Sequence, residues 1–166
     1  MNHQEGSFMP MVNKLVKLSS FVLFCEITGL AGGYFTARGI PDWYSNLKKP
    51  PFNPPSWVFT PVWTILYVMM GISAYLVYEK KEKKRKTALL LFAAQLFLNF
   101  WWTILFFTFR SPLAAFIEII ALLLTIVMTI VAFWPISKKA AILLLPYLLW
   151  VCFASVLNYS VWKLNS

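Results

Sequence analysis

The sequence predicts an all-α integral membrane protein, a bundle of five transmembrane helices. The chain has 166 residues, of which 60% are hydrophobic and only 13% are charged. A soluble domain of this size buries only about 70% of its unfolded surface, which is too little to hide so much apolar area. Five runs are long and apolar enough to cross roughly 30 Å of hydrocarbon. Since none shows the short alternating segments of a β-barrel, we expect helices.

The predicted spans follow one another within a single domain of residues 14–165. The first run is too long for the core of a signal peptide and is expected to be retained. Residues 1–13 are polar and irregular and are expected to form a flexible tail, in which Met9 and Met11 offer alternative starts. The five spans are expected at residues 18–38, 57–78, 87–109, 112–135 and 140–162.

The connection between the first two spans is expected to be a long loop rich in proline and tryptophan. Residues 42–63, DWYSNLKKPPFNPPSWVFTPVW, hold five of the ten prolines and three of the eight tryptophans. Proline fixes φ near −65° and favours extended backbone in the residue before it. We therefore expect a stiff, non-helical strap over the outward end of the bundle. The strap would present Trp43 and Tyr44 to a ligand, and Pro61 would direct Trp63 inward.

The basic residues predict the orientation in the membrane. The formal net charge is +9, and residues 79–86, EKKEKKRK, hold six of the fifteen Lys and Arg. The N-terminal tail with the second and fourth connections carries ten of them, and the remaining connections with the C-terminus carry five. Because positive charge stays on the cytoplasmic side, the N-terminus is expected inside and the 38–56 loop outside. Anionic lipid explains this distribution, so we expect no nucleic-acid partner.

Several kinds of conventional catalysis are excluded by missing residues. The one histidine is His3, so no internal histidine pair can ligate haem or a metal, and no triad can use imidazole as a base. The sequence has no glycine-rich phosphate loop and no HExxH motif. We expect no metal site and no required cofactor. Cys25 and Cys152 lie inside predicted spans and are expected to be buried thiols rather than a disulfide.

Three of the predicted spans carry aromatic and polar stripes with a spacing of three or four residues. Such stripes can form hydrogen bonds between helices, or they can line a pocket for a large, flat, mostly apolar ligand. The stripes are Trp63, Tyr67, Met70 and Ala74 in the second span, Gln95, Asn99, Trp102 and Thr103 in the third, and Tyr147, Trp150, Ala154, Asn158 and Trp162 in the fifth.

Two acids and two glycines inside the spans have both structural and functional interpretations. Glu26 and Glu118 suit either a proton path or neutral carboxyls in helix packing, and packing is favoured because no intramembrane base accompanies them. Gly29 and Gly33 form a GxxxG motif, which predicts close approach of two helices, within the bundle rather than between subunits.

Three stretches resemble the TspO/translocator protein family, the tryptophan-rich sensory proteins. They are DWYSNLKKPPFNPPSWVFTPVWTILYVMMGISAYLV (42–77), AAQLFLNFWWTILFF (93–107) and PYLLWVCFASVLNYSVWKLN (146–165). The resemblance extends over about residues 15–165. It implies a five-helix bundle, commonly a homodimer, in a membrane that we take to be bacterial. Its cavity would bind protoporphyrin IX, haem or, in some members, sterols and synthetic isoquinoline-type drugs.

The resemblance also implies which residues form the site and what they do. Trp63 and Trp150 match tryptophans held to matter for light- and oxygen-dependent porphyrin breakdown, so they are the candidate catalytic residues. Lys48 and Lys49 are candidates to pair with porphyrin propionates. The sterol motif falls on Leu157, Tyr159 and Lys163. The ligand-binding residues are expected to be Trp43, Tyr44, Trp63, Tyr67, Gln95, Asn99, Trp102, Trp150 and Ala154.

We therefore expect a tetrapyrrole-binding sensor or scavenger in the membrane, with light-dependent degradation of the porphyrin left open. The alternative is a transporter of porphyrins or other amphipathic ligands such as sterols, with the intramembrane acids coupled to protons. A third interpretation is a regulatory module whose ligand changes its contact with a protein partner. Five spans without a duplicated half suit alternating access poorly, which favours the first interpretation.

Overall fold

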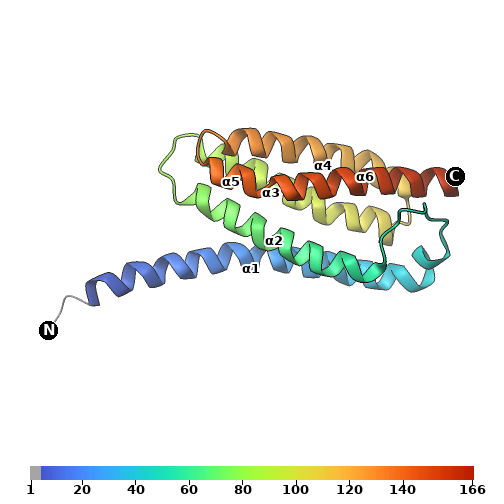
Figure 1. Ribbon diagram of the computed structural model, residues 1–166, viewed down its shortest axis with the longest axis horizontal. Coiled ribbons are helices and arrows are strands. Elements are labelled where there is room, and N and C mark those ends of the chain that lie inside the picture. The colour runs from blue at the N-terminus through green and yellow to red at the C-terminus, as the bar shows by residue number, and fades with distance from the viewer. Residues whose placement is uncertain (1–4) are drawn as a thin grey trace.

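The computed structural model describes the backbone of residues 5–166 and the side chains from residue 11 onward. Within this part of the chain all regular elements are helices and no strand occurs (Figure 1). Five helices are long and apolar enough to cross a membrane, which confirms the predicted number of spans. They are α1 (Glu5–Asp42), α2 (Ser56–Tyr78), α3 (Arg85–Thr103), α4 (Pro112–Phe133), and the pair α5 (Lys138–Leu143) and α6 (Leu145–Asn165).

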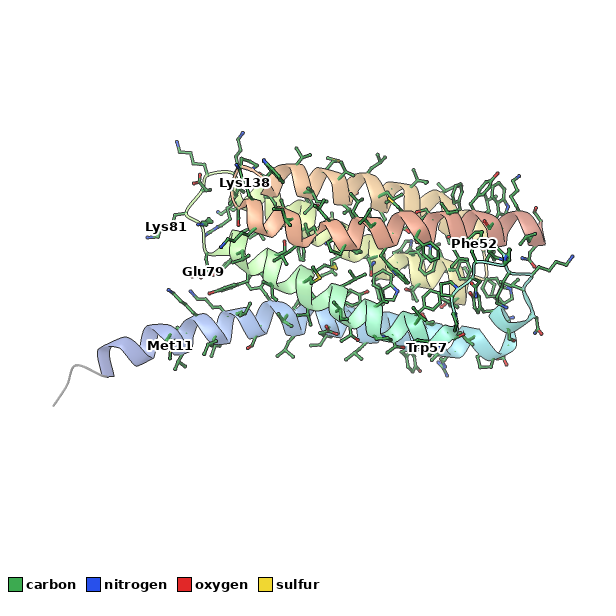
Figure 2. The ribbon with its side chains drawn as sticks, viewed as in Figure 1. Met11, Phe52, Trp57, Glu79, Lys81 and Lys138 are labelled. Atoms are coloured by element: carbon green, nitrogen blue, oxygen red, sulfur yellow. The ribbon has the colours of Figure 1, made fainter. Side chains whose placement is uncertain are left out.

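The bundle has two distinct ends. One end, which we call the strap end, holds the connection from α1 to α2 and the C-terminus (Figure 1). We call residues 43–55 of this connection the strap. The other end, which we call the basic end, holds the connections after α2 and α4, with Lys81 and Lys138 (Figure 2). At this end the N-terminal part of α1 extends away from the other helices (Figure 1).

Helix α1 is longer than the predicted span at both ends. It runs from Glu5 to Asp42, whereas residues 18–38 were expected. Part of the expected tail, residues 5–13, is thus helical, and residues 11–18, which contain the good helix formers Met, Lys and Leu, continue this helix into the span. Residues 1–4, including His3, lie outside the described part. The connection to α2 is correspondingly shorter than residues 38–56 and includes a 3₁₀ turn at Tyr44–Asn46.

Two of the spans are irregular. Helix α3 continues as a turn of π-helix at Ile104–Thr108, which extends the third span to Thr108. The fifth span is divided into α5 and α6, and Pro146 lies in the first turn of α6. Proline has no N–H group and its ring clashes with the carbonyl four residues earlier, so a continuous helix through Pro146 would be strained.

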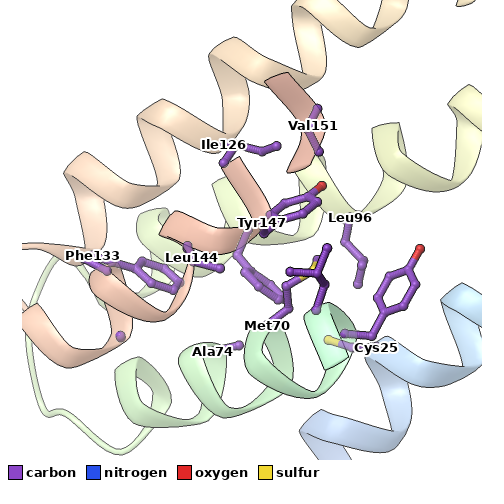
Figure 3. Close-up of a cluster of buried hydrophobic side chains, with 14 of the residues drawn as sticks. Cys25, Met70, Ala74, Leu96, Ile126, Phe133, Leu144, Tyr147 and Val151 are labelled. Atoms are coloured by element: carbon purple, nitrogen blue, oxygen red, sulfur yellow. The ribbon is translucent and has the colours of Figure 1, made fainter. Parts of the chain in front are cut away.

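The half of the bundle toward the basic end is tightly packed. Met70, Ala74, Phe133 and Tyr147 are among its fully buried side chains (Figure 3). Helices α1 and α2 approach closely at Gly71, where an added Cβ would lie 2.5 Å from the Cα of Val22. Close packing of this kind provides the attraction between helices in a lipid solvent, where the hydrophobic effect is absent.

Candidate functional site

A cavity of about 490 Å³ lies in the strap half of the bundle. Along α1 its lining runs from Glu26 to Ile40, and along α2 it runs from Tyr67 back to Ser56. The cavity therefore extends from the middle of the bundle to the strap, where Tyr44 contributes to the lining. Its volume lies within the range of about 300–1,000 Å³ that is typical of small-molecule sites.

Most of the predicted ligand-binding residues lie around this cavity, although they come from distant parts of the sequence. Six of these residues come from α2, α3 and α6, the helices that carry the three predicted stripes. The seventh, Tyr44, comes from the strap. The predicted residues that line the cavity are Tyr44, Trp63, Tyr67, Asn99, Trp102, Trp150 and Ala154.

Two predicted ligand-binding residues lie outside the cavity lining. The ring of Trp43 packs edge-on against Phe106, with 5.2 Å between the ring centroids. Gln95 is 1% exposed, and neither atom of its amide has a hydrogen-bond partner among the described residues. Gln95 lies one helical turn from Asn99 toward the basic end, where packed side chains take the place of the cavity. Helical spacing identified the face of α3 that turns toward the cavity, but it did not predict how far along α3 the cavity extends.

A buried hydrogen-bond network crosses the inner end of the cavity. The hydroxyl of Tyr67 donates to Oδ1 of Asn99. Nδ2 of Asn99 donates to the hydroxyl of Tyr147, with 3.2 Å between the atoms. These residues belong to α2, α3 and α6. The two interpretations of the polar stripes therefore apply together, because Asn99 both joins helices and lines the cavity.

A second set of hydrogen bonds fixes the indole of Trp102. Its Nε1 donates to Oδ1 of Asn158 at 2.9 Å, and Nδ2 of Asn158 donates to the carbonyl of Pro112 at 2.8 Å. The indole also stacks on Phe106, with ring centroids 5.1 Å apart and an angle of 20° between the planes. Trp102 therefore presents a flat wall with little freedom to move.

The two candidate catalytic tryptophans both line the cavity. The ring centroid of Trp63 lies 5.5 Å from that of Tyr67 and 6.2 Å from that of Tyr147. Trp150 packs edge-on against Phe59, with 5.9 Å between centroids, and its buried Nε1 has no hydrogen-bond partner among the described residues. Trp150 thus offers an unused donor, whereas the indole N–H of Trp102 is already bonded.

The strap is tied to the end of α6 by the side chain of Asn165. Its Oδ1 accepts from the backbone N–H of Lys48 at 3.0 Å, and its Nδ2 donates to the carbonyl of Lys48 at 2.9 Å. The same Nδ2 also donates to the carbonyl of Val161, one turn earlier in α6. One amide therefore connects the strap to a helix that lines the cavity. We call this pair of bonds the Asn165 clasp.

Inside the strap, Tyr44 is held from two sides. Its hydroxyl donates to Oδ1 of Asn53 at 2.9 Å, and Nζ of Lys49 lies 4.7 Å from the centre of its ring. Burial raises the pKa of Tyr44, while the hydrogen bond to Asn53 lowers it, and burial is the larger effect. Tyr44 therefore keeps its proton at neutral pH and remains a donor.

The two strap lysines are in different situations. Nζ of Lys49 donates to the carbonyls of Ser45 and Leu47, both at 3.1 Å, and so is already engaged within the strap. Lys48 is exposed. Of the two lysines predicted to meet a ligand carboxylate, Lys48 therefore has the more available ammonium group.

The three residues of the predicted sterol motif do not share one surface. Leu157 is buried and lines the cavity. Tyr159 is 43% exposed and packs against Phe116 and Trp162 on the outer face of the bundle. Lys163 is also exposed, with Nζ 4.3 Å from the centre of the Trp162 ring. Residues two apart on a helix point in different directions, so the motif divides between the cavity and the outer face.

Of the glycines and cysteines singled out inside the spans, one of each kind has its predicted role and the other does not. Gly29 packs against the ring of Tyr67, as its motif predicted, but a Cβ at Gly33 would meet nothing within 4 Å, and Gly33 lines the cavity. Cys25 is buried, whereas Cys152 is exposed on α6, contrary to expectation. Both thiols are free.

Glu26 also lines the cavity, while Glu118 is 9% exposed and lies outside the lining. No described group of three or more His, Cys, Asp or Glu side chains could hold a metal ion.

Comparison with known proteins places the chain in a family. The sequence model of the TspO/MBR family matches residues 21–163. The chain belongs to the TspO/MBR family. As the match includes most of each of the five spanning helices, it supports an integral membrane protein.

Family relatives occur in archaea, bacteria and animals. Tryptophan-rich protein TspO of Archaeoglobus fulgidus is 43% identical over 92% of this chain and 99% of its own length. Tryptophan-rich protein TspO of Chlorobaculum tepidum is also 43% identical, over 93% of this chain and 99% of its own length. Translocator protein of Homo sapiens is 40% identical over 90% of each chain.

Proposed function

We propose that the protein binds a tetrapyrrole, protoporphyrin IX or haem, in the strap-end cavity and acts as a sensor or scavenger of it. The observation that carries the proposal is the set of aromatic side chains that line one cavity from several elements, Tyr44, Trp63, Tyr67, Trp102 and Trp150. Aromatic faces bind a flat, apolar ring system by stacking and edge contacts. The described lining contains no histidine or cysteine, so the macrocycle would be held without axial ligation by those residues.

The strap defines how the ligand would be oriented. The polar propionates of a porphyrin favour the end of the cavity nearest water, where Tyr44 keeps its proton and Lys48 is exposed. An exposed ion pair contributes only about 0–1 kcal/mol, so Lys48 would orient the ligand more than hold it. The apolar edge of the macrocycle would lie against Trp63 and Trp150.

We infer that Trp63 and Trp150 give the bound porphyrin its photochemistry. An indole next to a photoexcited porphyrin can donate an electron to it, and the reduced porphyrin can pass that electron to molecular oxygen. This returns the porphyrin and leaves superoxide and an indole radical cation beside it, and these oxidants would then attack and degrade the macrocycle. An indole can also react with the oxygen species that the porphyrin generates. Both tryptophans line the cavity, as this chemistry requires.

One titration followed by illumination tests both parts of the proposal. Protoporphyrin IX is added to purified protein in the dark while tryptophan fluorescence is followed, and the absorbance of the same sample is then recorded under light. We expect saturable binding, and decay of the porphyrin faster than with detergent and free tryptophan. The Trp63→Phe, Trp150→Phe double variant should keep binding but lose the faster decay. Decay at the wild-type rate in this variant would contradict the photochemical role, and absence of saturable binding would contradict the proposed function.

We also propose that the N-terminus and the basic end face the cytoplasm and the strap faces outward. Single cysteines in a background without Cys25 and Cys152 test this. A cysteine at Lys81 should react with a membrane-impermeant maleimide only after the membrane is opened, and a cysteine at Lys48 should react in intact cells. The reverse pattern would contradict the orientation.

A further inference from the structure

The strap-end cavity opens at its side, between α1 and α2. Leu30 and Tyr34 of α1 line the cavity and are 72% and 57% exposed. Thr60 and Thr64 of α2 line it as well and are also exposed. Since these residues reach both the cavity and the outer surface, they mark the two edges of an opening. We call this opening the side slit.

The side slit lies where α1 and α2 separate. Toward the basic end the two helices are in contact, as the packing of Gly71 against Val22 shows. At Gly33, which is exposed and lines the cavity, an added Cβ would meet nothing within 4 Å. The distance along the helix axis from Gly33 to the end of α1 at Asp42 is about 13 Å. Because both helices span the membrane, the side slit opens into hydrocarbon rather than into water.

A cavity with these walls is unfavourable both when it is empty and when it holds water. A void in a protein interior costs about 24 cal/mol for each Å³, because the surrounding atoms lose packing contacts. A water molecule needs about two to four polar partners, and polar groups of the lining are already bonded within the protein. Thr36 donates to the carbonyl of Gly32, and the indole of Trp102 donates to Asn158. The apolar molecules next to the side slit are the acyl chains of the surrounding lipid.

The α2 edge of the side slit carries a row of hydroxyl groups. Ser56, Thr60 and Thr64 are spaced by four residues, line the cavity and are exposed. Residues four apart lie on one face of a helix, so the three side chains follow one another along the slit. Ser56 is the first residue of α2 and therefore lies at the strap end, close to the membrane surface. A hydroxyl group at this level can donate to the ester carbonyl of a lipid.

We propose that, when no other ligand is bound, the cavity holds an acyl chain of a membrane phospholipid, which enters through the side slit. The glycerol esters of the lipid would stay near Ser56 and Thr60, and the chain would lie between the aromatic walls. The chain exchanges one apolar environment for another, so its transfer costs little, and filling the void restores dispersion contacts. This inference rests on the proposed use of the cavity as a ligand site and assigns that site a second class of ligand.

An acyl chain and a tetrapyrrole would compete for the same walls. Trp102, Trp150 and Leu157 line the cavity that both would use. Binding of the macrocycle therefore returns the chain to the bilayer, and the lost contacts of the chain reduce the net free energy of binding. The affinity for protoporphyrin IX should accordingly depend on the lipid that surrounds the protein.

A photoactivatable lipid tests the proposal on the wild-type protein. Phosphatidylcholine with a diazirine near the middle of one acyl chain is placed in nanodiscs with the protein and illuminated briefly without oxygen. Mass spectrometry of the digested protein locates the adducts, and their mass shows whether an intact phospholipid or a free fatty acid was bound. We expect phospholipid adducts on Val151 and Leu157, which are buried and line the cavity. Leu149 and Val156 of the same helix are 69% and 56% exposed and serve as references for labelling from outside.

Two interventions should remove the cavity adducts and leave the reference adducts unchanged. Haem is the competitor, because its excited state decays before it can react. Gly33→Phe closes the side slit from a position where the backbone has room for a side chain. Each should lower the ratio of cavity to reference adducts by about fivefold or more. Ala37→Phe, at an exposed position of α1 outside the lining, is the matched control and should behave like wild type.

Two results would overturn the proposal. One is labelling of Leu149 and Val156 without labelling of Val151 and Leu157. The other is an unchanged adduct pattern in Gly33→Phe, because the chain would then not enter through the side slit. A single symmetric peak in gel filtration shows that this variant is folded, and Thr60→Phe, which closes the slit from α2, replaces it if it is not.

The two proposals can fail separately. If protoporphyrin IX binds saturably but the cavity residues carry no lipid adduct, the present inference fails and the proposed function stands. If neither protoporphyrin IX nor haem binds, while the adducts on Val151 and Leu157 depend on the side slit, the proposed function fails and the acyl-chain site stands.

Discussion

The two halves of the bundle use the same helices but fill their interiors differently. Toward the basic end, Met70, Ala74, Phe92 and Phe133 form a close-packed core. Toward the strap end, the same helices surround a cavity of about 490 Å³. The same helices therefore combine a close-packed half with a hollow half.

Two glycines show how this difference arises. At Gly71 an added Cβ would lie 2.5 Å from the Cα of Val22, so glycine is needed there for the contact between α1 and α2. At Gly33 an added Cβ would meet nothing within 4 Å. Gly71 allows the close contact between α1 and α2 in the packed half, whereas Gly33 faces open space in the hollow half.

The largest effect is expected at the contact between α1 and α2. Gly71→Ala should destabilise the protein by about 3 kcal/mol, because overpacking against backbone atoms cannot be relieved by a change of rotamer. Gly33→Ala is the matched control and should be neutral or stabilising by up to about 1 kcal/mol, since alanine is the better helix former. Thermal unfolding in the same detergent measures both. Equal destabilisation by the two substitutions would contradict the contrast.

A smaller effect is expected at the network that separates the two halves. Asn99→Leu removes the hydrogen bonds from Tyr67 and to Tyr147 and should cost about 1–2 kcal/mol of stability, within the range measured for bonds between membrane helices. Ser20→Ala, at an exposed residue whose hydroxyl bonds only within its own helix, should cost less than about 0.5 kcal/mol. Unfolding in increasing denaturant provides the comparison, and an unchanged midpoint for Asn99→Leu would argue against the network.

The Asn165 clasp should affect ligand binding more than stability. Asn165→Ala removes both bonds to Lys48 and should weaken protoporphyrin IX several-fold, because the strap then has to be ordered when the ligand binds. Hydrogen exchange at residues 43–55 should become faster while exchange in the helices stays the same. Ser166→Ala, at the next position, is the control. If affinity and strap exchange do not change, the clasp does not order the strap for ligand binding.

The smallest effect is expected from the strap prolines. Replacing Pro50, Pro51, Pro54 and Pro55 with Ala gives the unbound strap more conformations, which should weaken porphyrin binding about two- to fivefold and leave the spans folded. Fluorescence titration measures affinity, and far-UV circular dichroism measures helix content. Unchanged affinity would indicate that the strap only connects α1 to α2 and that its stiffness does not contribute to ligand binding.

The fold was largely predictable from the sequence, because an apolar run of about 20 residues has few alternatives in lipid. Boundaries were less predictable where a helix continues beyond its apolar part. Helix α1 runs on to Asp42 and shortens the connection, since hydropathy detects lipid-facing residues rather than backbone geometry. The division at Pro146 could be anticipated only as a kink or a helix start.

The helix faces that turn toward the site were predictable from the sequence, but the point along the helices at which the cavity ends was not. Helical spacing placed Trp63, Asn99 and Trp150 on facing stripes, and these residues do line one cavity. The same spacing also selected Gln95, which lies among packed side chains, because a stripe continues past the point where the cavity ends.

Other features of the site depend on tertiary contacts that leave no local pattern. The Asn165 clasp joins residues 117 positions apart in the sequence. The position of Glu26 in the cavity depends on which face of α1 meets α2, and its sequence neighbours do not reveal that face.

The central claim is that the strap half of the bundle is hollow in order to hold a ligand, and filling the cavity tests it most directly. Ala154 lines the cavity, whereas Ala121 is exposed on α4. Dark fluorescence titrations with protoporphyrin IX should show wild-type affinity for Ala121→Phe and at least tenfold weaker binding for Ala154→Phe, with similar unfolding temperatures for both variants. Wild-type affinity in Ala154→Phe would contradict the claim, because the ligand would then lie elsewhere.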